Sequence, residues 1–113
     1  MHTERPRARR YPFVVGIELT DVQSEVKIRE RTSDVSLFGC HVDTLKPLPT
    51  GTRIIIRIAH RGANFAALGT VVYAGLNAGM GVAFSKIEEK DQLVLEKWID
   101  ELRDEEEMRS QGH

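Results

Sequence analysis

The chain has 113 residues, of which 41% are hydrophobic and 29% charged, and this size and composition are typical of a single globular domain. No apolar run approaches the ~20 residues that a membrane-spanning helix needs, and the basic start MHTERPRARR lacks the apolar stretch of a secretory signal. Cys40 is the only cysteine, which excludes an internal disulfide and is consistent with a reducing compartment. We therefore expect a cytoplasmic domain that does not enter the membrane.

Opposite charges collect at the two ends of the chain. Residues 1–10 contain four arginines and one acid, whereas residues 88–107 contain ten acids and three bases, so the formal net charge is only −1. Domains that bind DNA or RNA usually carry excess positive charge over one broad face, and those that bind single strands add exposed aromatic residues. Here the basic region is one short arm and aromatic residues make up 6%. The pattern favours a local anion site over a nucleic-acid-binding surface.

Short segments rich in β-branched residues follow the arm and predict strands. The predicted strands cover residues 14–19, 26–29 with a continuation through 32–36, 40–42, 53–59, 68–74 and 80–84. Turn residues separate them, including two prolines and a glycine within 46–51, Arg61–Asn64 and residues 76–79. Because strands and turns alternate every 8–12 residues without intervening helices, the pattern indicates an antiparallel barrel or sandwich.

The periodicity becomes helical from Ser85 onward. Ser85-Lys86-Ile87-Glu88 has the form of a capping box, although a helix start nearer Asp91 fits equally well. An apolar stripe on this helix consists of Val94, Leu95, Trp98, Ile99 and Leu102. Such a stripe has to be buried, either against the barrel or against a second copy of the chain, so a monomer and a homodimer both remain open.

These elements predict a mainly β domain of about six antiparallel strands, arranged as a barrel or sandwich, followed by one C-terminal α-helix. We divide the chain into a flexible basic arm at 1–13, a barrel at 14–84 and a helix at 85–109.

Two short motifs occur in this framework. Arg5-Pro6-Arg7-Ala8-Arg9 contains Arg-x-x-x-Arg just before the first predicted strand, and Asp34-Val35-Ser36-Leu37-Phe38-Gly39 is Asp-x-Ser-x-x-Gly at a strand-to-strand turn. Together, in this order and within a small β pattern, they resemble the PilZ family of cyclic di-GMP receptors. The resemblance extends to the strand after the second motif, the glycine-rich strand 79–84 and the closing helix. It implies a six-stranded antiparallel β-barrel of the PilZ-like, split-barrel type with a C-terminal α-helix.

The resemblance also implies site residues for cyclic di-GMP. Arg5 and Arg9 would bind the ligand with Arg10 as a helper, because an arginine fork pairs with phosphate or with the O6 and N7 atoms of guanine. Asp34, Ser36 and Gly39 would line the nucleotide pocket, Gly39 by adopting a positive φ or by letting the backbone approach the ligand. An offset register that uses Arg7 or Arg10 remains open. Glu4, where many relatives have arginine, leaves open whether one ligand molecule or a stacked pair binds.

Other functions find less support in the sequence. No nucleophile–base pair or carboxylate pair is evident, so we do not expect an enzyme. Cys40 reads as a small core residue, and the scattered histidines lack metal-ligand spacing, so we expect neither a metal nor a cofactor. The leading interpretation is a receptor whose arm becomes ordered on ligand binding and which signals to a downstream protein partner. The alternative is a PilZ-like interaction adaptor with weak or no nucleotide binding.

Overall fold

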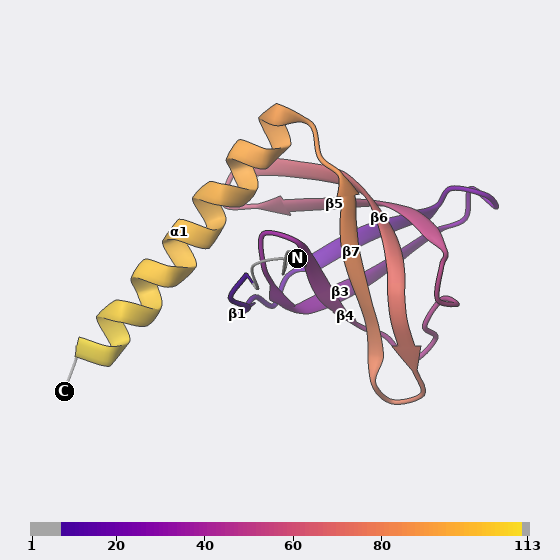
Figure 1. The fold of residues 1–113 in the computed structure, drawn as a ribbon, viewed down its shortest axis with the longest axis horizontal. Coiled ribbons are helices and arrows are strands. Elements are labelled where there is room, and N and C mark those ends of the chain that lie inside the picture. Colours follow the sequence, from indigo (N-terminus) through magenta and orange to yellow (C-terminus); the bar gives the residue numbers. More distant parts are fainter. Residues whose placement is uncertain (1–7, 112–113) are drawn as a thin grey trace, which may run out of the picture.

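A computed structural model describes residues 8–111 of the chain (Figure 1). This part contains seven strands and one helix, in the order β1 (Tyr11–Pro12), β2 (Gly16–Asp21), β3 (Lys27–Val35), β4 (Gly39–Asp43), β5 (Arg53–His60), β6 (Ala63–Gly75), β7 (Gly79–Lys86) and α1 (Glu89–Gln111).

Six of these strands form a closed antiparallel barrel, as the sequence predicts. The sheet has the order β1-β3-β2-β5-β6-β7-β4, and an additional pairing of β3 with β4 closes it. Because the barrel is closed, each of its six strands is paired on both sides over most of its length. Closure therefore removes the exposed strand edges that promote aggregation. β1 lies outside the closed ring and pairs only with β3.

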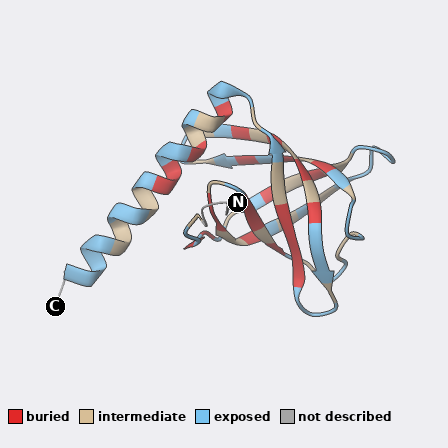
Figure 2. Cartoon of the chain, in the orientation of Figure 1, coloured by how far each residue is buried: buried red, intermediate tan, exposed pale blue. Residues whose placement is uncertain are grey.

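The barrel interior is filled by the inward-facing residues of each strand. β5 shows the alternation most clearly, because Ile54, Ile56 and Ile58 are buried while the residues between them are not (Figure 2). This period of two is the one expected for strands with one buried face. β5 and β6 are joined by a two-residue turn in which Arg61 has φ 51° and Gly62 has φ 77°, the left-handed geometry that tight hairpins require. β6 therefore begins earlier than the predicted strand at 68–74.

The end of the predicted arm takes part in the fold. Tyr11 pairs with Val35 and Pro12 with Asp34, and the side chains of Tyr11 and Phe13 are buried in the core. The arm carries apolar anchors as well as arginines, and their burial accounts for the short strand β1 that the sequence did not predict.

The helix packs its apolar stripe on the barrel of the same chain. Leu95, Trp98 and Ile99 are buried, and the Trp98 ring lies against Phe13 and Phe65 with centroid distances of 5.7 and 6.0 Å. The helix begins at Glu89, so the capping box at Ser85 is not formed. Ser85 is instead the penultimate residue of β7, and its hydroxyl donates to the carbonyl of Leu68 at 3.1 Å.

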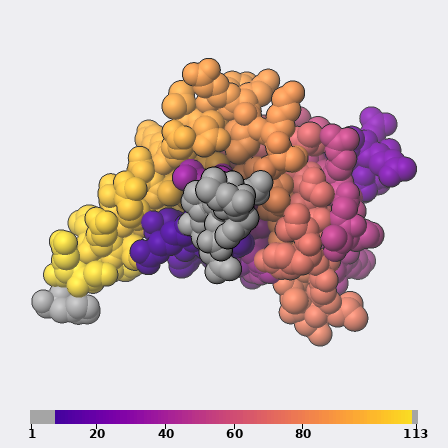
Figure 3. Space-filling view, viewed as in Figure 1, coloured from indigo at the N-terminus to yellow at the C-terminus, as the bar shows by residue number. Residues whose placement is uncertain are grey.

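The first turn of α1 also completes the edge of β6. β7 pairs with β6 only from Leu68 onward, so the preceding residues of β6 need other partners for their outer edge. The carboxylate of Asp91, which is buried, accepts a hydrogen bond from the backbone N–H of Ala66 at 2.9 Å. The last turns of the helix extend away from the barrel, past the region of β1 (Figure 3).

Candidate functional site

Strand β1 brings the basic arm to the second motif. In addition to the two β1–β3 pairs, the N–H of Phe13 donates to the carbonyl of Ser33 at 3.0 Å. Because the buried rings of Tyr11 and Phe13 anchor this segment, the residue before Tyr11 has to emerge beside Asp34. The fold therefore places Arg10, near the end of the basic arm, beside Asp34 of the second motif.

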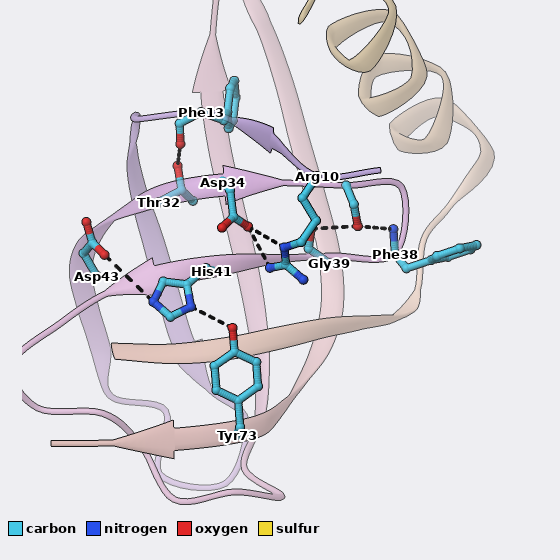
Figure 4. A network of polar contacts seen from close by, with 10 residues as sticks. Arg10, Phe13, Thr32, Asp34, Phe38, Gly39, His41, Asp43 and Tyr73 are labelled. Carbon is cyan, nitrogen blue, oxygen red and sulfur yellow. Dashed lines mark hydrogen bonds and ion pairs between the residues drawn. The ribbon is translucent and has the colours of Figure 1, made fainter. Parts of the chain in front are cut away.

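Arg10 and Asp34 form the central contact of this site (Figure 4). The Nε and Nη2 atoms of Arg10 donate to the Oδ1 atom of Asp34 at 2.9 and 2.7 Å. The two side chains are 47% and 32% exposed, respectively, so solvent still reaches both partners. A β-bulge between Thr32 and Asp34 allows this placement, because it adds a residue and turns Asp34 to the outer face while Thr32 and Val35 stay inside.

The segment from Ser36 to Gly39 is a tight turn held by its own polar groups. The N–H of Ser36 donates to the carbonyl of Gly39 at 2.8 Å, and the buried hydroxyl of Ser36 accepts from the N–H of Phe38 at 3.1 Å. Ser36 thus stabilises the turn, as serine commonly does when it bonds the backbone two residues ahead.

The structure gives a reason for glycine at position 39 that the sequence did not indicate. Its φ is not among the positive values of the described residues, and the close approach is to strand β7 of the protein. A Cβ atom at this position would lie 2.1 Å from the carbonyl oxygen of Val82 and 3.2 Å from the Cα of Ala83. Glycine therefore permits β4 and β7 to pair closely beside the turn.

Arg9, the other arm arginine among the described residues, makes its contacts away from Asp34. The guanidinium of Arg9 lies over the ring of Tyr11, 5.3 Å from its centroid, and forms an ion pair with Glu106 near the end of α1. Arg5 lies outside the described residues. The structure thus brings Arg10, Asp34, Ser36 and Gly39 together, whereas Arg9 contacts the helix.

Cys40 and His41 follow the turn on opposite faces of β4, as the alternation predicts. Cys40 is buried in the core, and burial, with a smaller contribution from the Asp34 carboxylate, raises the pKa of its thiol to about 12. His41 faces outward as the cross-strand partner of Asp34. Its Nδ1 atom lies 2.7 Å from the hydroxyl of Tyr73, and its Nε2 atom lies 3.9 Å from Asp43 (Figure 4).

Sequence reasoning did not identify His41 and Tyr73 as site neighbours. The position of His41 could have been inferred, because it lies two residues after Gly39 and has to lie opposite a residue near Asp34. Tyr73 carries no such signal, since it belongs to a strand that is distant in sequence.

Two of the surface hollows among the described residues are large enough to hold a small ligand. One, of about 780 Å³, begins at His41 and lies between β3, β4 and the β6–β7 hairpin, with Arg29, Arg31 and Asp43 in its wall. The other, of about 700 Å³, lies between β2, β5, β6 and the start of α1. Of these two, only the first adjoins the Arg10–Asp34 contact, through His41, which is the cross-strand partner of Asp34.

Residues 8–111 contain neither a cluster of metal ligands nor a helix that could span a membrane. No group of three or more His, Cys, Asp or Glu side chains in this range is arranged to hold a metal ion. The helix of the same range is not long and apolar enough to cross a membrane.

Solved structures share the fold of this chain. The PilZ domain of CeSA from a cellulose-synthesizing bacterium superposes with a TM-score of 0.71 at 18% identity, over 85% of this chain and 99% of that one. The PilZ domain with c-di-GMP of YcgR from Escherichia coli gives 0.71 at 19% identity, over 96% and 98%. The Bacillus subtilis inhibitor of motility, MotI/DgrA, gives 0.66 at 16% identity, over 85% of this chain and 50% of that one.

At these identities the structural likeness establishes the fold. No curated protein matches the chain with significance. The sequence profile of the PilZ domain, however, matches residues 4–101, which include both motifs, all barrel strands and the buried part of the helix. The chain therefore belongs to the PilZ domain family.

Proposed function

We propose that this chain is a cyclic di-GMP receptor that binds its ligand on the outer face of the barrel, beside the turn that ends at Gly39. One observation carries the proposal. Arg10 and Asp34, which are 24 residues apart in sequence, meet on the surface next to that turn. Membership of the PilZ family supports it, as does the presence of c-di-GMP in the similar YcgR domain.

The chemistry of the site suits a ligand with two phosphates and two guanines. Arg10 presents a partly exposed guanidinium that can pair bidentately with a phosphate or with the O6 and N7 atoms of a guanine. The Asp34 carboxylate can accept hydrogen bonds from the N–H edge of a guanine. We assign Ser36 and Gly39 the role of holding the turn that shapes this side of the pocket. Arg5 and Arg9 are the arm cations that would close over the bound ligand.

Glu106 provides a route from ligand binding to an output. Arg9 forms an ion pair with Glu106 on the helix. A ligand phosphate would compete with this carboxylate for the same guanidinium. When Arg9 binds the ligand instead, its ion pair with Glu106 at the acidic end of α1 is broken. This changes the surface that the helix presents to a downstream protein partner. The receptor acts by binding and carries out no chemical step.

The experiment is calorimetric titration of the purified chain with cyclic di-GMP. We expect a Kd in the micromolar range or tighter, which corresponds to about −8 kcal/mol or better. Arg10→Ala removes a charge-assisted contact and leaves Asp34 without its partner, so it weakens binding by about 10-fold or more. Arg9→Ala removes a second cation and also weakens binding.

Two controls define the outcome. Arg53→Ala removes an exposed arginine on β5, a strand that pairs with neither β3 nor β4, and it leaves the affinity unchanged. GTP, which offers guanine and phosphates in an open chain, gives no binding. The molar ratio distinguishes one ligand from a stacked pair, the question raised by Glu4. Absence of both heat and thermal stabilisation at high cyclic di-GMP concentration would exclude the receptor function and leave the adaptor alternative.

A further inference from the structure

A row of cross-strand neighbours extends from the Arg10–Asp34 contact across four strands of the barrel. Asp34 on β3 is the partner of His41 on β4, His41 is the partner of Gly81 on β7, and Gly81 is the partner of Tyr73 on β6. Directly opposite residues in a sheet share a face. The row therefore forms one strip of the outer surface, with the Arg10–Asp34 pair at one end and an aromatic ring at the other.

Both ends of this strip face outward because the strands carry β-bulges. The bulge in β3 turns Asp34 to the surface, and a second register shift lies between Val71 and Tyr73 in β6. Val71 is fully buried, so strict alternation would direct the side chain of Tyr73 into the barrel. The extra residue directs it outward, and Tyr73 is 46% exposed. Bulges that re-aim a side chain in this way occur preferentially next to functional sites.

Gly81 lets the Tyr73 ring lie flat across the strip. A Cβ atom at Gly81 would be 2.0 Å from Cε2 of Tyr73, so any other residue would displace the ring. Over this glycine the ring reaches β4, where its hydroxyl contacts Nδ1 of His41 at 2.7 Å. The Tyr73 and His41 rings are stacked with a centroid distance of 5.7 Å and an angle of 28°.

The Tyr73 ring is therefore oriented by His41 while much of its surface is open to solvent. An aromatic ring that is already immobilised loses little conformational freedom when a base stacks on it. The hollow of about 780 Å³ that begins at His41 supplies space beside the strip.

We propose that Tyr73 is a stacking platform for one guanine of the bound cyclic dinucleotide and that His41 is its positioning residue. The inference rests on the proposed function, because the strip begins at Arg10 and Asp34. It extends the site by two strands beyond the two sequence motifs. It also predicts that the base of the ligand, as well as its phosphates, contributes to affinity at this end of the site.

The test is cyclic di-GMP titration of three Tyr73 variants of the full chain. Tyr73→Ala removes the platform and weakens binding by about fivefold or more, the range found for loss of a base-stacking ring. Tyr73→Phe keeps the ring and restores most of that affinity. Tyr73→Leu keeps a large apolar side chain without an aromatic face and binds as weakly as Tyr73→Ala. Val72→Ala, a change at the exposed neighbouring position, is the matched control and binds like the wild type.

The outcomes separate this inference from the proposed function. Loss of affinity in the alanine and leucine variants, at an unchanged midpoint of thermal unfolding, supports the stacking role. If the wild type binds and Tyr73→Ala binds equally well, the stacking role is wrong and the receptor function stands. If Tyr73→Phe is as weak as Tyr73→Ala, the hydroxyl contact and not the ring face matters, which also overturns the inference. If the wild type does not bind at all, both proposals fail.

Discussion

We expect Gly39→Ala to destabilise the protein strongly, because the backbone of β7 lies very close to Gly39. In Gly39→Ala the new methyl carbon would lie 2.1 Å from the carbonyl oxygen of Val82, whereas ordinary contact begins at 3.4 Å. The obstructing atom belongs to the backbone of β7, so no side-chain rotation can relieve the clash. β4 and β7 have to separate by more than an ångström at a point where they are hydrogen-bonded neighbours.

The magnitude follows from what this separation disrupts. Forcing one extra carbon into a close-packed site costs about 1–3 kcal/mol, and weakening of a ladder hydrogen bond adds to this. We therefore expect Gly39→Ala to lower the free energy of unfolding by about 2–3 kcal/mol, a large share of the stability of a small domain. The same change should weaken ligand binding, because Gly39 ends the turn beside Asp34.

Urea unfolding followed by tryptophan fluorescence measures this effect. Trp98 is the only tryptophan and is 2% exposed, so its emission reports on packing of the helix against the barrel. Gly16→Ala is the matched control, because nothing lies within 4 Å of a Cβ at that position. The control should be neutral or slightly stabilising. Equal stability of the two variants would refute the close-packing argument for Gly39.

Three further predictions concern the arm, the core and the helix. Glu106→Gln frees Arg9 for the ligand and tightens cyclic di-GMP binding by up to about fivefold, since an exposed ion pair contributes about 0–1 kcal/mol; calorimetry that shows unchanged or weaker binding would contradict the competition. The Cys40 thiol, whose pKa is about 12, reacts with a thiol reagent at pH 8 only as fast as the protein unfolds, and labelling at the rate of a free cysteine would disprove its burial. Asp91→Ala leaves the N–H of Ala66 without its partner and lowers the free energy of unfolding by about 1–3 kcal/mol in the same urea assay; a change below 0.5 kcal/mol, the usual size for surface sites, would contradict the edge-capping role.

Local patterns in the sequence were sufficient to predict the strands and the helix. Alternating β-branched segments and turn residues predicted the six barrel strands, and the stripe around Trp98 predicted the C-terminal helix. Each of these features depends on the residue's own strand or helix period, which is visible without knowing the partners. The two motifs could likewise be recognised in the sequence, and the match to the PilZ family confirms the resemblance that they indicated.

Other features depended on contacts between distant segments, and only the tertiary structure decided them. The helix stripe packs on the barrel of its own chain, and β1 pairs with β3 because Tyr11 and Phe13 find space in the core. Position 39 requires glycine because strand β7 approaches it closely, and the contacting residue of β7, Val82, is more than forty positions away in the sequence.

In the candidate site, too, some features were predicted by the sequence and others were decided by strand pairing. The motif predicted Asp34 as a site residue, but its contact with Arg10 depends on where β1 docks. Its orientation, and that of Tyr73, depends on β-bulges at which the alternation of inward and outward residues changes phase. A bulge is decided by the pairing of two strands, and one strand's sequence does not reveal it. The sequence by itself therefore determined the elements and the motif, whereas strand pairing determined which side chains meet on the surface.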